Sequence, residues 1–423
     1  MKHYNFEFIK GGVMKALQLK DGITWVGALD PNLRVFDIIM KTEFGTSYNS
    51  YMIEGEDKIA LVETVKLKCF DHYIKRLREL VDISKIEYII VNHTEPDHVG
   101  SVAKMLELNP NIKIVGSKVA IRFLRNIVNK DFNSIVVNNG DIIDLGGKTM
   151  EFIMAPFLHW PDTMYTYIKE DKVLITCDSF GAHYSFEDML YSKITKKEDY
   201  EASLKYYFNM IMGPFKGYVL NAIDKIKDKD IDMILPGHGP ILDKNPGKIV
   251  KMYENWATEV NIFEKKTVVI PYVSAYGYTE QLAKELAKGI KSEGVDVLSY
   301  DMVISDKDEV MEKIRWADGL LFGTPTINGD ALPPIWDLVM SMSPMVHSKK
   351  LAAAFGSYGW SGEAVGNIEA RFKMLRLKQF ETGMKIPFKP SHEELDRAFS
   401  YGKRFAETLL GKNKNNCNAT KEY

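Results

Sequence analysis

Cysteine is scarce in this chain of 423 residues. Only Cys69, Cys177 and Cys417 occur, far apart and odd in number. A disulfide framework and a cysteine-based zinc or iron–sulfur site are therefore excluded. The scarcity of cysteine favours a reducing compartment, and we expect a cytoplasmic protein.

Long apolar runs and an excess of charge are also missing. No apolar stretch approaches the ~20 residues of a membrane span, and the first 22 residues mix charges and glycines where a signal peptide would need an unbroken apolar run. The 55 basic and 57 acidic residues give a net charge of −2. Such a balance offers no overall field for nucleic acid or an anionic membrane, so we expect neither as a partner.

The composition that remains, 45% apolar and 26% charged, is that of a globular protein, and the length predicts two domains. Residues 1–262 are rich in short β-type runs with some helices, which indicates a mixed α/β domain. A charged amphipathic helix around residues 250–266 is the expected linker. Residues 263–410 alternate strand and helix five times, which predicts a doubly wound parallel sheet. The polar tail, 411–423, is expected to be disordered.

Metal-ligand residues gather at the ends of predicted strands in the first domain. The strand IEYIIVN leads into His93-Thr94-Glu95-Pro96-Asp97-His98, which places four potential ligands in six residues. Three more follow other apolar runs, namely His159, Asp178 and His238. Strand ends are where α/β sheets place their sites, so we expect these seven side chains to meet rather than to be separate polar groups.

Seven ligands make two sets of four if one carboxylate is shared, and Asp178 is the expected bridge. Such sharing would place two metal ions ~3.5–4 Å apart. His183, five residues after Asp178, is a candidate catalytic residue that faces either the substrate or the metal ligands; the alternative is a structural role.

The pattern His-x-Glu-x-Asp-His with a later His, Asp and His resembles the metal-binding pattern of the metallo-β-lactamase superfamily, specifically its flavodiiron branch. Most of that superfamily has His where Glu95 stands. A carboxylate in place of an imidazole makes the site harder and more anionic, which favours iron over zinc.

A phosphate site is predicted at the first loop of the second domain. The strand TVVIPYV is followed by a hydroxyl- and glycine-containing loop and then by a predicted helix; the loop residues are Ser274, Ala275, Tyr276, Gly277, Tyr278 and Thr279. Backbone N–H groups and the helix dipole at such a loop bind phosphate. The loop has no Gly-x-Gly-x-x-Gly and no Walker lysine, which favours a monophosphate. The alternative is a plain turn.

Two later loops leave strand ends in the same way and could wrap a planar ring. They are Thr324, Pro325, Thr326, Ile327, Asn328 and Gly329, and Ser357, Tyr358, Gly359, Trp360, Ser361 and Gly362. The three loops resemble those of flavodoxins, in which the first holds the phosphate of flavin mononucleotide (FMN) and the others clasp its ring system. The chain departs from the commonest flavodoxin pattern at Tyr276, where Thr is usual. Tyr358 and Trp360 either border the flavin or are core aromatics.

Together the two halves resemble the flavodiiron proteins over nearly the whole chain. The resemblance implies a metallo-β-lactamase-like αββα sandwich followed by a flavodoxin-like sheet, with FMN and two iron ions as cofactors. It implies reduction of dioxygen to water, of nitric oxide to nitrous oxide, or of both. One iron would take His93, Glu95, His159 and Asp178, and the other Asp97, His98, Asp178 and His238.

The resemblance also implies partners. We expect rubredoxin or a similar external electron donor, because no rubredoxin with paired Cys-x-x-Cys motifs is fused to the chain. A head-to-tail homodimer, or a dimer of dimers, is expected as well. Two other functions remain open from the residues. A zinc-dependent hydrolase fused to a flavodoxin would share most of the ligands but not Glu95, and a pure electron carrier would leave the first-half cluster without a purpose.

Overall fold

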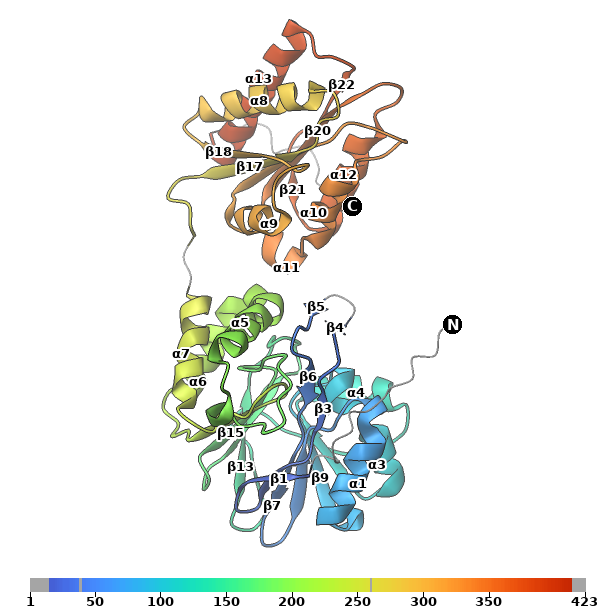
Figure 1. Cartoon of the computed structure of the whole chain (residues 1–423), viewed down its shortest axis with the longest axis vertical. Helices are drawn as coiled ribbons and strands as arrows, with labels where there is room; N and C mark the ends of the chain where they lie inside the picture. The colour runs from blue at the N-terminus through green and yellow to red at the C-terminus, as the bar shows by residue number, and fades with distance from the viewer. Residues whose placement is uncertain (1–14, 38–39, 259–260, 413–423) are drawn as a thin grey trace. The chain divides into compact units, whose positions relative to one another are not determined.

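The computed structural model describes residues 15–37, 40–258 and 261–412 (Figure 1). The chain divides into two compact units, Met1–Glu259 and Val260–Tyr423. The predicted disordered tail, 411–423, lies outside the described residues except for its first two positions.

The first unit is built on two mixed sheets. One has the strand order β1 (Leu17–Lys20), β2 (Ile23–Trp25), β7 (Tyr51–Glu54), β8 (Ile59–Val62), β9 (Ile86–Val91), β10 (Lys113–Gly116), β11 (Asn133–Val136). The other has the order β12 (Ile142–Asp144), β13 (Thr149–Met154), β14 (Met164–Ile168), β15 (Val173–Cys177), β16 (Met233–Pro236). Two small ribbons pair β3 (Ala28–Asp30) with β6 (Thr46–Tyr48), and β4 (Val35–Phe36) with β5 (Met40–Lys41).

Helices cover the outer faces of both sheets. Those of the first half are α1 (Phe70–Leu80), α2 (Pro96–Val99), α3 (Val102–Leu108) and α4 (Lys118–Val128), and those of the second half are α5 (Lys197–Tyr207), α6 (Lys216–Ile226) and α7 (Pro246–Ala257). The central strands, such as β8 and β15, are continuous apolar runs because both of their faces are buried. In β8, Ala60 and Val62 join the core between the sheets, while Ile59 and Leu61 pack toward the helices. These layers are the expected αββα sandwich.

Helix α7 corrects one prediction, because it belongs to the core of the first unit and is not a linker. Ile249, Tyr253 and Ala257 lie four residues apart, share one helix face and are buried among the aromatic side chains of the second half. The ring of Tyr253 contacts Phe180 at 4.9 Å and Phe208 at 5.0 Å between centroids. The many charges on the exposed face of the helix concealed this stripe.

The second unit is a single sheet whose strand pairs are all parallel. Its order is β18 (Asp296–Asp301), β17 (Thr267–Tyr272), β19 (Gly319–Gly323), β20 (Leu351–Tyr358), β21 (Lys378–Gln379), and β22 (Met384–Pro387) also pairs with β20. The chain starts in β17 and adds β18 on one side and β19 on the other. The topology therefore switches between β17 and β19, and open α/β sheets bind ligands at such a point.

Helices lie on both faces of this sheet (Figure 1), which confirms the doubly wound fold. They are α8 (Tyr278–Lys291) and α13 (His392–Leu409) on one face, and α9 (Lys307–Trp316), α10 (Pro333–Ser341), α11 (Pro344–His347) and α12 (Glu363–Met374) toward the other. Helix α13 begins with the capping box of Ser391 and Glu394. Within the described ranges, no helix combines the length and the apolar character needed to cross a membrane.

Candidate metal centre and flavin site

The seven predicted metal ligands come from loops at the carboxyl ends of four strands in the first unit. His93 follows β9 after one residue, Asn92, and Glu95 to His98 form the start of α2 and the residue before it. Pro96 at the first position of α2 suits a helix start because it lacks an N–H. His159 lies between β13 and β14, Asp178 follows β15, and His238 follows β16. The structure brings all seven together, as the strand-end argument predicts.

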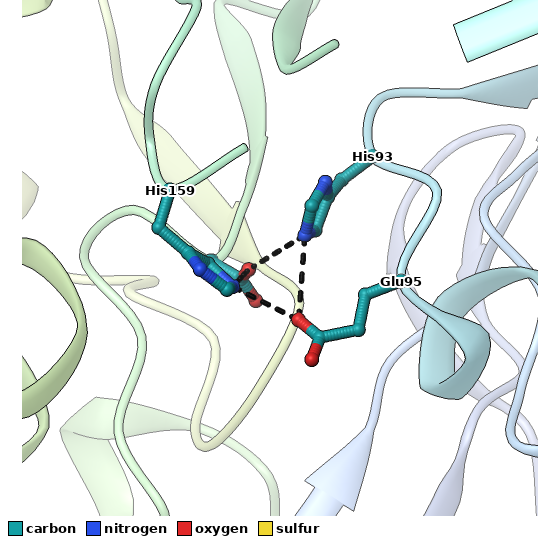
Figure 2. A group of neighbouring side chains, drawn as sticks. His93, Glu95 and His159 are labelled. Atoms are coloured by element: carbon teal, nitrogen blue, oxygen red, sulfur yellow. Dashed lines mark hydrogen bonds and ion pairs between the residues drawn. The ribbon is translucent and has the colours of Figure 1, made fainter. Parts of the chain in front are cut away.

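One set of ligands converges at the first candidate metal position. Figure 2 shows His93, Glu95 and His159 pointing toward one another. The Nε2 atom of His159 is 2.9 Å from Oε2 of Glu95, and Nε2 of His93 is 3.4 Å from the same oxygen. Oδ2 of Asp178 lies 3.5 Å from the ring nitrogen of His93 and 3.4 Å from that of His159. These four residues form a group that could hold a metal ion.

The other oxygen of Asp178 faces a second set. Its Oδ1 is 3.1 Å from Nε2 of His98 and 3.5 Å from Nε2 of His238. Asp97 completes this set, with Oδ2 at 3.1 Å from His238. The two oxygens of one carboxylate thus point to two separate groups of ligands, which is the arrangement a bridging carboxylate needs.

The charges of the site suit cations. Burial alone would raise the pKa of Asp178, but His98 and the neighbouring imidazoles hold it well below its usual value. Burial alone would lower the pKa of His98, yet Asp97 and Asp178 raise it to about 10. Both oxygens of Asp97 and Oδ2 of Asp178 are buried and have no hydrogen-bond partner among the described residues. The oxygens of Asp97 instead lie close to the ring nitrogens of His98 and His238. The buried carboxylates therefore stabilise positive charge in this pocket.

The outer nitrogens of two of the histidines are held by the surrounding protein. Asp162 accepts hydrogen bonds from the backbone N–H and the hydroxyl of Thr94 at 2.7 and 2.8 Å, and it lies 3.3 Å from Nδ1 of His93. Nδ1 of His238 donates to the carbonyl of Ser47 at 2.6 Å. A proton on Nδ1 leaves the lone pair of Nε2 directed into the site, which is how metal-binding histidines are usually oriented.

His183, predicted as a catalytic residue, lies beside the metal ligands and not among them. Its ring is 5.1 Å from that of His238, and its Nδ1 is 2.9 Å from the hydroxyl of Thr46. Burial, together with His238, lowers the pKa of His183 well below its usual value, so the ring is neutral. Its Nε2 and the hydroxyl of Tyr207 are both buried without a hydrogen-bond partner among the described residues.

The first predicted flavin loop connects β17 to α8. Gly277 adopts φ +78° immediately before the helix, a conformation that favours glycine. The hydroxyl of Ser274 accepts a hydrogen bond from the N–H of Glu280 at 3.2 Å. Since α8 spans 14 residues, the positive end of its dipole lies at this loop.

The other two loops are tied to the first and to each other. The hydroxyls of Thr279 and Ser357 are 3.1 Å apart, which links the first loop to the third. The N–H of Thr326 donates to the carbonyl of Ser357 at 3.0 Å, and the N–H of Ala364 donates to the hydroxyl of Thr326 at 3.3 Å. Asn328 and Gly329 form the tip of the second loop, both with positive φ. The structure therefore brings the three loops to one edge of the sheet, around the switch point.

Two aromatic side chains of these loops face solvent. Trp360 is 99% exposed and Tyr276 is 81% exposed, whereas Tyr358 is partly buried. The alternative interpretation of Trp360 as a core aromatic is therefore wrong. An exposed ring at this edge is free to border a planar ligand or a second protein surface.

Sequence reasoning missed several residues around the metal ligands. No sequence pattern around Asp162 marks it as a functional residue, because its role depends on a turn of the chain that places it beside Thr94. Tyr207 ends α5, where the helix widens into a short π-helix, Phe208–Met212, and such widenings occur often at functional sites. Glu63, which follows β8, could have been found, because the strand-end rule that identified the ligands applies to it as well.

Comparisons with known proteins agree with this two-part architecture. Residues 46–239 match the family model described as ODP family beta lactamase, and residues 270–402 match the flavodoxin model. The chain thus joins a β-lactamase-like domain to a flavodoxin domain.

Several relatives match this chain over nearly their full length. Flavo-diiron protein FprA2 of Clostridium acetobutylicum is 42% identical over 402 residues, covering 94% of this chain and 100% of that protein. A nitric oxide reductase of Moorella thermoacetica is 35% identical, covering 92% of this chain and 98% of that one. The solved structure of rubredoxin oxygen:oxidoreductase from Desulfovibrio gigas has a TM-score of 0.69 and 28% identity, covering 95% of this chain and 100% of that one. The chain belongs to the flavodiiron protein family.

Membership confirms the expected fold class and cofactors. The flavodoxin domain is one that binds FMN, and the family has a diiron centre. The residues of this chain fit both groups, because buried carboxylate oxygens face imidazoles at two adjoining positions and three linked loops surround a switch point. The general activity is that of an oxidoreductase.

Proposed function

We propose that the chain reduces dioxygen to water, nitric oxide to nitrous oxide, or both. The observation that carries the proposal is the position of Asp178, whose two oxygens face two complete sets of ligands. The names of two relatives, a nitric oxide reductase and a rubredoxin oxygen:oxidoreductase, support this choice of substrates.

The proposed ligand sets follow from the distances. One iron would be held by His93, Glu95, His159 and Asp178, and the other by Asp97, His98, Asp178 and His238. When bound, the two ions supply Lewis-acid binding sites and two electrons, and reduced FMN supplies two more. Three carboxylates among seven ligands make a hard, anionic set, which favours iron over the zinc of a hydrolase.

His183 and Tyr207 are the side chains proposed to act on the substrate next to the metals. When the Thr46 hydroxyl donates to Nδ1 of His183, the ring proton is on Nε2, which has no other partner in the described residues. The Tyr207 hydroxyl is a second buried donor, in ring contact with His183 at 4.9 Å. Because both groups stay neutral, they donate hydrogen bonds to a small diatomic ligand without competing for the metal.

The three loops of the second unit are proposed to hold FMN. The phosphate would be bound by Ser274 to Thr279 at the N-terminus of α8, where the N–H groups and the dipole favour an anion. Residues 324–329 and 357–362 would hold the ring system between them. We further propose rubredoxin or a similar small protein as the electron donor, and the cytoplasm as the location, which the scarcity of cysteine supports.

The test is to measure the consumption of dioxygen and of nitric oxide in parallel by the purified, reduced protein, with metal and flavin content determined on the same samples. We expect about two irons and one FMN per chain, and turnover of at least one gas. A matched control is His392→Asn, an exposed histidine of α13, which should behave as the wild type. Zinc in the active form together with hydrolase activity would instead support the fused hydrolase, and a protein with flavin but no gas turnover would support the electron carrier.

A further inference from the structure

A second group of buried polar side chains lies next to His98. Glu63 follows β8 and Cys177 ends β15, and both are at most 1% exposed. A carboxylate oxygen of Glu63, a ring nitrogen of His98 and the sulfur of Cys177 all lie within 4.8 Å of one another. None of the interactions described above for the metal ligands uses Glu63 or Cys177.

Two polar atoms in this group are unsatisfied. Oε1 of Glu63 accepts a hydrogen bond from the N–H of Asn92 at 2.8 Å, but Oε2 has no partner within the described residues. Nδ1 of His98 is also buried without a partner there. Leaving a buried donor and a buried acceptor unpaired costs about 1–3 kcal/mol each. Pairing the two atoms, directly or through one bridging water, would remove both costs.

The same segment holds His98 through its backbone. The N–H and the hydroxyl of Thr64 both donate to the carbonyl of His98, at 2.8 and 2.6 Å. On another side, a Cβ atom at Gly237 would come within 2.7 Å of Cε1 of the His98 ring, so the ring is packed directly against that glycine. Glu63 itself adopts φ +61°, an unfavourable conformation for a residue other than glycine. Strain of this kind persists where the surrounding structure requires it, often at functional sites.

We propose that Glu63 is the positioning residue for His98: its free oxygen accepts the Nδ1 proton, so that Nε2 presents its lone pair to the metal position shared with Asp97 and His238. Glu63 then does for His98 what Asp162 does for His93 and the Ser47 carbonyl does for His238. The inference rests on the proposed metal centre and adds a residue that controls one of its two positions.

The group could also be considered a third metal site, but its chemistry argues against this. Burial raises the pKa of the Cys177 thiol well above its usual value. The thiol would therefore have to lose its proton in a fully buried environment to become a ligand. A hydrogen bond between Glu63 and His98 does not involve the thiol.

Glu63→Gln tests the proposal. Glutamine has one acceptor oxygen and keeps the bond from Asn92 or the bond from His98, but not both. We expect the variant to release one of its two metals to a chelator about 10- to 100-fold faster than the wild type, and the other at an unchanged rate. Glu63→Asp, which keeps two acceptor oxygens, should release that metal more slowly than Glu63→Gln does. The control is Glu54→Gln, an exposed residue at the end of β7.

A spectroscopic readout separates positioning from a general loss of stability. In the cobalt-loaded protein, the Nδ1 protons of metal-bound histidines give shifted NMR signals that disappear in deuterium oxide. Glu63→Gln should move or abolish one of these signals, and Asp162→Asn should affect a different one.

The proposal would be overturned by a variant that keeps all the proton signals and both release rates. It would also be overturned by equal loss of both metals with a lowered melting temperature of the metal-free protein, or by a third metal per wild-type chain. Failure of the wild type to bind two metals would instead count against the proposed function.

Discussion

Asp178 is the residue on which the proposed metal centre depends most, because each of its oxygens serves a different metal position. Asp178→Asn keeps the size of the side chain but removes the charge that balances two cations. We expect both metals to be lost together, from about two per chain to fewer than one, with turnover falling accordingly. Elemental analysis and gas-consumption rates provide the measurement.

The comparison is His238→Asn, which changes a ligand of one position only and should remove about one metal per chain. Full metal content and full turnover in Asp178→Asn would show that this residue does not bridge.

His347 gives a prediction for pH. It ends α11, is 5% exposed, and its Nδ1 accepts a hydrogen bond from the N–H of Ser343 at 3.1 Å. Burial lowers its pKa from 6.5 to about 4. Between these values the unfolded chain takes up a proton that the folded chain refuses. His347 therefore reduces the free energy of unfolding as the pH falls from 6.5 to 4, by on the order of 3 kcal/mol.

Urea unfolding of the full chain, monitored by the fluorescence of the FMN that is released, would measure this effect. The difference in free energy of unfolding between the wild type and His347→Gln should change between pH 7 and pH 4.5. We expect the wild type to lose roughly 2 kcal/mol relative to the variant, in line with the lowered pKa of His347. The exposed residue His392 provides the control, since His392→Gln should follow the wild type at both values. A constant difference between wild type and His347→Gln would contradict the prediction.

At the scale of residues, the sequence predicts the proposed metal ligands well, but it predicts poorly the residues that hydrogen-bond to those ligands. His93, His159, Asp178 and His238 could be found because each follows an apolar run and strand ends converge. Asp162 could not, because its role arises from a turn that returns it to Thr94, and nothing local in the sequence encodes that return.

At the scale of elements, strand β20 shows how closely the flavin loops approach the sheet. A Cβ atom at Gly356 would lie 1.8 Å from the carbonyl oxygen of Thr324. Gly356→Ala must therefore displace the second loop from the strand, which should cost about 1–3 kcal/mol of stability and weaken FMN binding. Thermal unfolding and flavin titration would measure both effects.

Gly366→Ala is the matched control in the same unit. Gly366 lies on the exposed face of α12, and a Cβ atom there would have no neighbour within 4 Å among the described residues, so alanine should leave FMN binding unchanged. It should raise stability by up to about 1 kcal/mol, since alanine favours the helix. Unchanged stability and flavin affinity in Gly356→Ala would mean that the two segments separate easily.

Elements with a strong period could be predicted, and those with mixed signals could not. The five strand–helix repeats of the second unit and the capping box of α13 are confirmed, because apolar runs and local capping residues determine them. The prediction of a linker helix over 250–266 is wrong as far as Ala257, because α7 packs into the core of the first unit. The charged positions between its buried residues hide the stripe in the sequence; these buried residues are Pro246, Ile249, Tyr253 and Ala257.

At the scale of the whole molecule, each proposed cofactor site belongs entirely to one unit. All seven proposed metal ligands lie before residue 259, and all three flavin loops lie after residue 260. Electrons must therefore pass between units, and we propose that they pass between the two chains of a head-to-tail dimer, as the family resemblance implies.

Mixed dimers test this proposal. One chain carries His93→Asn and His98→Asn and lacks metal; the other carries Ser274→Asp and Thr279→Asp, whose carboxylates repel the FMN phosphate at the N-terminus of α8. Each should be inactive alone. Subunit exchange should restore part of the gas-reduction rate, because one intact flavin then serves one intact metal centre across the interface. Verified mixed dimers without activity would show that electrons pass within a chain.

Helix α7 also has a consequence for how the protein is made. The core of the first unit is complete once Ala257 has been synthesised, and 166 residues of the 423 remain to be added. At 5–20 residues per second, a ribosome needs roughly 8–33 s for that remainder, and N-terminal domains generally fold first. The first unit therefore has time to fold on the ribosome before the flavin domain exists.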